Sequence, residues 1–294
     1  MRWFDERLHH AWLNHGYTQR FEITRVVYQK KTEFQDLIIF DNPAFGRVLA
    51  LDGIIQTTER DEFAYHEMLA HVPLFAHGKV KTVLIVGGGD GGVLREVLRH
   101  DIDKATLVEI DRAVIDSCRE HMPRLGGGAF EDGRVHVVIA DGVAFVAESG
   151  DTFDVVIVDS TDPIGSGAAL FTAEFYGNCK ARLAPGGVLV TQNGVPFFQP
   201  DEVAESYRRL APLFADATFY VTAVPTYIGG LMTLGWATDD ASLRTLSEAV
   251  IARRVAKAGI ETRYYAPPVH LGAFALPPFI TALMAGDGHT RPGP

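Results

Sequence analysis

The chain has 294 residues, 47% of them apolar and 22% charged, and its formal net charge is −10. This length and composition are typical of a globular protein with one large domain or two unequal ones. The acidic balance argues against broad contact with nucleic acid, which needs a basic surface, and is compatible with a cationic small substrate.

Two further features bear on cellular location. No apolar run approaches the length that spans a bilayer, and acidic residues appear early in residues 1–6, so we expect neither a membrane anchor nor a secretory signal. The two cysteines, Cys118 and Cys179, argue against a disulfide scaffold and are expected to be small buried hydrophobic residues. We therefore expect a cytoplasmic protein.

The first part of the chain, residues 1–60, lacks an alternation of strands and helices and is predicted to be a small antiparallel β domain. Asp52 and Gly53 lie between two apolar runs and are typical of a tight hairpin. The expected strands are 21–28, 36–40, 47–51 and 54–58, with a turn at 41–46.

In the second part, residues 61–294, strands alternate with helices, which predicts an α/β domain with a doubly wound, mostly parallel sheet. Asp61 opens an acidic turn followed by apolar residues at helical spacing, which predicts a helix over 61–76. The expected strands are 82–86, 105–110, 135–139, 153–158, 187–191, 217–222 and 232–237. The expected helices are 92–100, 112–121, 141–148, 172–182, 201–214 and 243–258, and 289–294 is expected to be a frayed end.

The strongest motif is the apolar strand and glycine loop at 83–92. Gly87, Gly89 and Gly92 have the spacing of a nucleotide-binding turn. Asp90 is unusual there, because such a loop presents N–H groups to phosphate, whereas a carboxylate repels phosphate and attracts a cation. We therefore expect a nucleoside ligand that carries a positive charge at this point, which neither a dinucleotide nor intact S-adenosylmethionine provides.

More carboxylates follow the later strands, at the sheet edge where ligands bind in open α/β folds. Glu109 ends the second strand and is expected to accept hydrogen bonds from ribose hydroxyls, rather than being only a solvated strand end. Asp141 precedes Gly142, and from spacing alone it could accept from an adenine amine or simply cap a helix.

Asp159 and Asp162 lie in one short loop after the fourth strand. With Asp90 they could form a metal site, or they could receive ammonium groups and provide a base. No histidine joins these acids at ligand spacing, and three acids without a phosphate are a weak magnesium site. The sequence therefore favours the ammonium receiver and base, and we predict no metal.

Several stretches, in order, resemble the spermidine synthases, which are polyamine aminopropyltransferases, and most closely the bacterial members. The resemblance extends over nearly the whole chain. The matching stretches are 51–63, 65–67, 87–92, 159–163 and 225–230.

The resemblance implies that the aminopropyl group of decarboxylated S-adenosylmethionine passes to putrescine, giving spermidine and 5′-methylthioadenosine. It also implies a methyltransferase-like Rossmann domain behind the small β domain, a homodimer or homotetramer, and no cofactor. Asp159 would be the base. The implied donor-binding residues are Gln35, Gly87, Gly89, Asp90, Glu109, Asp141 and Gly142, and the implied amine-binding residues are Tyr65, His66, Asp90, Asp159, Asp162 and Tyr227.

Two positions depart from many family members. His66 stands where many carry glutamine, and Ser166 lies in a stretch, 164–168, where relatives often have Gly-Pro, so we expect a more flexible loop and assign Ser166 no contact. Other readings stay open at this stage: another amine such as cadaverine, agmatine or spermidine, a small-amine methyltransferase, or a binding protein without turnover.

Overall fold

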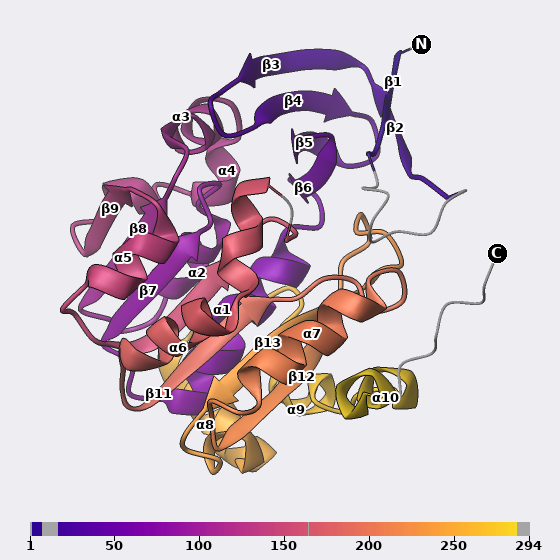
Figure 1. Ribbon diagram of the computed structural model, residues 1–294. Coiled ribbons are helices and arrows are strands. Elements are labelled where there is room, and N and C mark those ends of the chain that lie inside the picture. Colours follow the sequence, from indigo (N-terminus) through magenta and orange to yellow (C-terminus); the bar gives the residue numbers. More distant parts are fainter. Residues whose placement is uncertain (1, 8–16, 164, 287–294) are drawn as a thin grey trace.

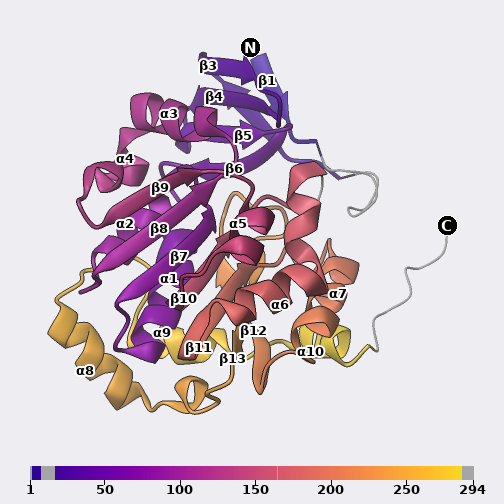
Figure 2. The ribbon, with the colours of Figure 1, turned by 60° about the vertical axis from the view of Figure 1, so that its left-hand side comes forward.

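The computed structural model describes residues 2–7, 17–163 and 165–286, which contain three β-sheets (Figure 1). One sheet has two strands, one has four, and the largest has seven. The two smaller sheets come from the N-terminal part of the chain and lie at one end of the seven-stranded sheet, as both ribbon views show (Figures 1 and 2). The predicted domain boundary at residue 60 stays a prediction.

The N-terminal strands are antiparallel, as predicted, but their number differs. The prediction of a single strand over 21–28 is wrong, because the strand is interrupted at Thr24. Residues 20–23 pair with a short strand at 2–5 that the sequence analysis missed, and residues 25–31 pair with 36–42. Asp52 and Gly53 form the predicted hairpin, both with positive φ, 50° and 83°. The strands are β1 (Arg2–Asp5), β2 (Arg20–Ile23), β3 (Arg25–Lys31), β4 (Asp36–Asn42), β5 (Gly46–Leu51) and β6 (Ile54–Thr58).

The seven-stranded sheet has the order β12-β13-β11-β10-β7-β8-β9 and confirms the predicted fold class. β7 to β11 are parallel, β13 runs antiparallel to β11, and β12 pairs antiparallel with β13. Strand order reverses between β7 and β10, which is where open α/β sheets bind their ligands. The strands are β7 (Thr82–Gly87), β8 (Lys104–Glu109), β9 (Val135–Ile139), β10 (Phe153–Asp159), β11 (Leu183–Gln192), β12 (Asp216–Ala223) and β13 (Leu231–Thr238).

Helices cover both faces of this sheet (Figure 2). Because side chains alternate along a strand, Val83 and Ile85 of β7 pack with one core cluster, whereas Leu84 and Val86 pack with the other. The helices are α1 (Phe63–His77), α2 (Gly92–Leu98), α3 (Arg112–His121), α4 (Pro123–Gly126), α5 (Gly142–Glu148), α6 (Ala173–Ala181), α7 (Pro200–Leu210), α8 (Glu248–Ala258), α9 (Pro267–Ala273) and α10 (Pro278–Ala285). The 3₁₀ helices are Ala129–Glu131, Gly165–Phe171 and Leu243–Thr245.

Helix α1 begins two residues later than predicted, and the side chain of Asp61 binds other segments of the chain. Its carboxylate is buried and accepts hydrogen bonds from the Thr58 hydroxyl and from the backbone and hydroxyl of Thr226. Asp61 therefore ties the end of β6 to the segment between β12 and β13, a role that the sequence pattern does not reveal.

The C-terminal part departs most from prediction. The helix predicted over 243–258 is a 3₁₀ turn followed by α8, and α9 and α10 were not predicted. Glu67 of α1 holds this part in place: its carboxylate accepts the backbone N–H groups of Arg263, Tyr264 and Tyr265, the shortest at 2.8 Å. The side chain of Glu67 is buried, so these bonds lie inside the fold.

Three remaining predictions concern the core and the chain ends. Cys118 and Cys179 are both buried, as expected. The predicted frayed end, 289–294, lies outside the described residues. Among the described residues no single helix has the length and apolarity to cross a membrane, although α9 and α10, bent by 47° at their junction, would pass together on length and composition alone.

Candidate active site

A cavity of about 270 Å³ lies at the carboxyl ends of β7 and β10, beneath the N-terminal strands. Every site residue predicted from the sequence lines it. They are Gln35, Tyr65, His66, Gly87, Gly89, Asp90, Glu109, Asp141, Gly142, Asp159, Asp162 and Tyr227.

The glycine loop lies so close to its neighbours that side chains would collide with them. A Cβ on Gly87, whose φ is +84°, would meet the backbone oxygen of Asp159 at 2.1 Å. A Cβ on Gly92 would meet the His66 ring at 2.1 Å. The glycines therefore allow the loop to pack against the end of β10 and against α1 at once, which brings Asp90 close to both.

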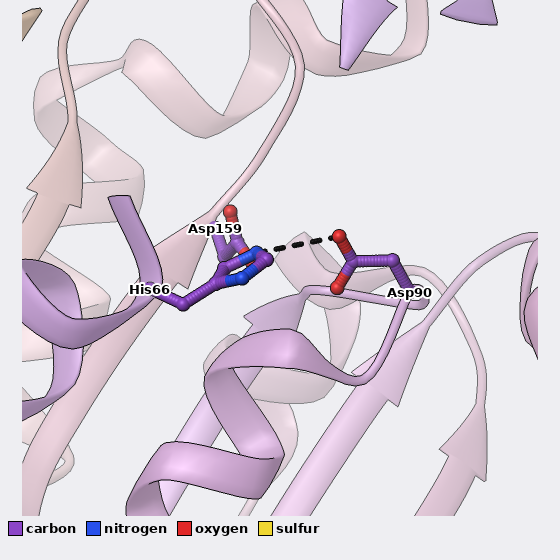
Figure 3. Close-up of side chains that lie close together, drawn as sticks. All are labelled: His66, Asp90 and Asp159. Carbon is purple, nitrogen blue, oxygen red and sulfur yellow. Dashed lines mark ion pairs between the residues drawn. The ribbon is translucent and has the colours of Figure 1, made fainter. Parts of the chain in front are cut away.

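His66, Asp90 and Asp159 all line the cavity and lie close together (Figure 3). His66 Nε2 lies 3.3 Å from Asp90 Oδ2, and one ligand-type atom from each of the three residues lies within 4.8 Å of the others. The sequence argument that no histidine joins these acids is therefore wrong: α1 brings His66 to them from a distant part of the chain. A group of this kind can surround a cation.

The pKa values of the acids and of Tyr65 in this group depart from their ordinary values. Burial, and then the charge of Asp90, raise the pKa of Asp159 to about 6. Burial would also raise the pKa of Asp90, but the charge and hydrogen bond of His66 outweigh it and keep that pKa lowered. Tyr65 donates its hydroxyl to Asp159 Oδ1 at 2.7 Å, and burial raises the pKa of this tyrosine well above its ordinary value. Asp159 is thus a stronger base than a solvated aspartate, with Tyr65 as a fixed donor.

Asp162 is oriented by two side-chain amides that the sequence analysis missed. Gln199 Nε2 donates to Asp162 Oδ2 at 2.9 Å, and Gln192 Nε2 lies 3.3 Å from Asp162 Oδ1. The Gln199 amide is itself oriented, because its Oε1 accepts the backbone N–H of Val195 at 2.7 Å. Gln192 ends β11, so its place at a strand end could have suggested it, whereas nothing in the sequence distinguishes Gln199.

Another part of the cavity wall carries the expected nucleoside-binding residues. Burial raises the pKa of Glu109 to about 7, against the opposing hydrogen bond that it accepts from Asp111 N at 2.9 Å. Gln35 Nε2 donates to Asp111 Oδ2 at 3.1 Å, which brings the N-terminal sheet to this side. Asp141 caps α5 by accepting Val143 N at 2.7 Å, so it caps a helix and lines the cavity at the same time.

Aromatic rings and a further acid complete the cavity wall. Tyr65 and Tyr227 pack edge to face with their centroids 5.9 Å apart, and the Tyr227 hydroxyl donates to Gln56 O. Glu6 from the N-terminal part also lines the cavity, although sequence reasoning gave it no role. Burial raises the pKa of Glu6 to about 7, and it accepts the backbone N–H of Ile55. The wall therefore combines carboxylates with apolar rings, which suits an alkylamine.

Comparison with known proteins agrees with this geometry. The spermine/spermidine synthase domain family matches residues 62–247, and the spermidine synthase tetramerisation domain matches residues 2–59. The chain is 54% identical over 277 residues to the polyamine aminopropyltransferase of Klebsiella pneumoniae (strain 342), covering 94% of this chain and 97% of that protein. It is 52% identical over 279 residues to the polyamine aminopropyltransferase of Shigella sonnei (strain Ss046), covering 95% and 97%.

Solved structures give the same result. A crystal structure of a spermidine synthase in complex with the transition-state analogue AdoDATO is similar with a TM-score of 0.91 and 39% identity, covering 97% of this chain and 95% of that one. The spermidine synthase from Thermotoga maritima is similar with a TM-score of 0.88 and 38% identity, covering 97% and 94%. The chain therefore belongs to the spermidine synthase family of polyamine aminopropyltransferases.

Proposed function

We propose that this enzyme transfers the aminopropyl group of decarboxylated S-adenosylmethionine to putrescine, giving spermidine and 5′-methylthioadenosine. The observation that carries the proposal is the set of carboxylates that line one cavity: Glu109, Asp90, Asp159 and Asp162. A sulfonium nucleoside with a terminal ammonium and a diamine together present several cations to such a cavity. The transition-state analogue bound by a structural relative is consistent with the proposal.

The donor would lie across the glycine loop. Glu109 would accept hydrogen bonds from the ribose, with Asp141, Gly142 and Gln35 around the adenine end, and Asp90 would bind the ammonium of the aminopropyl chain. This assignment accounts for a carboxylate in a loop type that usually binds phosphate. It also explains why intact S-adenosylmethionine, with a carboxylate at the same end, is a poor fit.

The amine would enter between Tyr65 and Tyr227, with Asp162 and its two amides binding the distal ammonium. An alkylamine with a pKa of about 10.4 is almost entirely protonated at pH 7, and freeing its lone pair costs roughly 4–5 kcal/mol. Because the pKa of Asp159 is raised to about 6, it lies closer to the pKa of the amine than that of a solvated aspartate does. Orienting the nitrogen, carbon and sulfur in line is expected to contribute more than the proton transfer.

The proposed chemistry is a single displacement. Asp159 accepts a proton from the attacking amine, and the freed nitrogen lone pair forms a bond to the methylene carbon beside the sulfonium. The carbon–sulfur bond breaks, and its electron pair goes to sulfur, which leaves as the neutral thioether of methylthioadenosine. The positive charge therefore passes from sulfur to the new secondary amine.

We also propose that the reaction needs no metal ion or other cofactor. His66, Asp90 and Asp159 are close enough to surround a cation, but both ring nitrogens of His66 face carboxylates, at 2.6 Å from Glu62 and 3.3 Å from Asp90. A ring that donates from both nitrogens has no lone pair for a metal. Enzyme treated with a chelator should keep its full rate, and a loss restored by a divalent metal would contradict this proposal.

The function is tested by supplying the donor with a panel of amines. Decarboxylated S-adenosylmethionine and putrescine should give methylthioadenosine and spermidine in equal amounts, and intact S-adenosylmethionine should give neither. Absence of methylthioadenosine would refute aminopropyl transfer. A higher kcat/KM for cadaverine, agmatine or spermidine would support aminopropyl transfer but refute putrescine as the preferred acceptor.

The match to a tetramerisation domain supports an oligomer, and we propose a homodimer or a homotetramer. Light scattering of the purified protein distinguishes these two states from a monomer.

A further inference from the structure

His66 contacts a second carboxylate, Glu62, which the sequence analysis did not assign to the site. Glu62 precedes α1 by one position and lies one helical turn before His66, with Glu62 Oε2 2.6 Å from His66 Nδ1. Both side chains are almost fully enclosed: that of His66 is 2% exposed and that of Glu62 is 10% exposed. Glu62 is not among the residues that line the cavity, so it can act on a ligand only through another residue.

The two ring nitrogens of His66 face two different carboxylates. Nδ1 faces Glu62, and Nε2 faces Asp90 Oδ2 at 3.3 Å. A neutral imidazole can donate from only one nitrogen, so the doubly protonated ring is the form that satisfies both contacts. Burial alone would lower the pKa of His66, but Asp90 and Glu62 outweigh it and raise that pKa well above its ordinary value.

Arg95 of α2 holds Glu62 from the other side. Arg95 NH2 lies 2.8 Å from Glu62 Oε2 and 2.8 Å from Glu96 Oε1. Opposite charges therefore alternate from Arg95 through Glu62 and His66 to Asp90. Because these side chains are largely shielded from water, each ion pair is strengthened. This alternation fixes the Glu62 carboxylate against the imidazole ring.

Asp90 is in turn held at both of its oxygens. Oδ1 accepts the backbone N–H of Gly92 at 2.8 Å, and Oδ2 faces His66. A carboxylate held at both oxygens has one orientation, and its remaining lone pairs point in fixed directions. The contact between His66 and Asp90 is strongest when the ring is charged, and Glu62 adds to Asp90 in keeping that charge.

We propose that Glu62 is a positioning residue for aminopropyl transfer: it holds His66 as a cation against Asp90 and so orients Asp90 toward the ammonium of the donor. The inference rests on the proposed function of the cavity. The other groups that face His66 are Tyr65 from its own helix, with ring centroids 5.5 Å apart, and Asp159 from the end of β10. Neither of these two groups contacts Nδ1, which faces Glu62.

The first test is Glu62→Gln, which keeps the size of the side chain and removes its charge. The pKa of His66 should fall, and its contact with Asp90 should lose ionic strength at neutral pH. We expect the donor KM to rise about tenfold, the effect of losing one hydrogen bond to a charged group. Because the His66 charge lowers the pKa of Asp159, its loss should also move the acidic limb of kcat/KM to higher pH.

The second test is a double-mutant cycle with His66→Gln, since a glutamine at position 66 needs no charged partner. If Glu62 acts through His66, then Glu62→Gln should change neither the donor KM nor the pH limb in the His66→Gln background. Additive effects of the two substitutions would overturn the proposal. If Glu62→Gln does not fold, Glu62→Asp takes its place in the cycle, with a smaller shift that also disappears with His66→Gln.

Glu96→Gln is the matched control. Glu96 is a more deeply buried carboxylate that contacts the same arginine but does not touch His66. Its loss should lower the thermal unfolding temperature without moving the pH limb, and a shift equal to that of Glu62→Gln would refute a specific role for Glu62. Failure of the wild-type enzyme to release methylthioadenosine would instead refute the proposed function.

Discussion

Asp90 and Asp162 lie at two regions of one cavity and are held in different ways. Asp90 is held by a buried cation, His66, and by a backbone N–H, whereas the amides of Gln192 and Gln199 orient Asp162 without adding charge. Changing what holds Asp90 therefore changes charge and proton affinity, whereas changing the amides changes orientation alone. The two proposed ammonium sites are therefore held by different means, although both use an aspartate.

The largest effect is expected between these two regions, at Asp159. Asp159→Asn removes the proposed base and should lower kcat/KM for putrescine by about 10²–10⁴-fold. The measurement is the initial rate of methylthioadenosine release at saturating donor. Asp154→Asn is the control, because Asp154 is the second residue of the same strand and accepts the backbone N–H groups of Lys81 and Thr82. That variant should lose stability and keep its rate, and a comparable loss of rate in both would remove the special role of Asp159.

A direct comparison of Asp90 with Asp162 should separate donor from acceptor. Asp90→Ala should weaken binding of the decarboxylated donor by about tenfold to hundredfold and leave binding of methylthioadenosine, which has no ammonium, much less affected. Asp162→Asn should raise the KM of putrescine by a similar factor and leave donor affinity close to wild type. Calorimetry with the donor and with methylthioadenosine measures the first difference. Equal losses for both ligands would contradict the assignment of Asp90.

A smaller effect is expected at Gln199. Gln199→Met keeps the volume of the side chain and removes both its contact with Asp162 and its contact with the Val195 backbone. We expect the KM of putrescine to rise about threefold to tenfold, in line with one hydrogen bond to a charged group, with the donor KM unchanged. Gln199→Glu should be worse, because it places a second carboxylate against Asp162. A rise in donor KM of the same size would mean that the two regions are not separate.

The smallest expected effect is a displacement of the pH profile. Asp159 must be deprotonated to act as a base, so kcat/KM should fall as the pH drops through about 6. Asp90→Asn removes the like charge that raises this pKa while Glu62 still holds His66, so the acidic limb should move to lower pH. Asp162→Asn should leave the limb in place. A limb that moves equally in both variants would show that the electrostatic difference between the regions does not exist.

The sequence predicted the residues that line the cavity better than the contacts that orient them, for a physical reason. Gly87, Gly89 and Asp90 lie on one continuous strand, loop and helix, and Glu109 ends the neighbouring parallel strand, so local pattern alone brings them together. The contacts of Gln199 and Glu62 depend on how distant segments pack, which local periodicity does not encode.

The same distinction explains the errors in the fold. The parallel strands of the Rossmann sheet are long apolar runs and were predicted well. Helices α9 and α10 are short and depend on tertiary contacts, and the break at Thr24 depends on which strand each half pairs with. The pairing of His66 with the acids likewise depends on how α1 packs against the sheet.

The bonds from Glu67 to the backbone of residues 263–265 have a consequence for the order in which the chain is made. Tyr65 and His66, which contact Asp159 and Asp90, immediately precede Glu67 on α1. These residues leave the ribosome long before the segment that supplies the N–H donors. Until that segment is synthesised, the Glu67 carboxylate lacks those donors and α1 lacks this anchor beside the cavity. The hydrogen bonds that anchor α1 beside the cavity therefore cannot form before residues 263–265 have been synthesised.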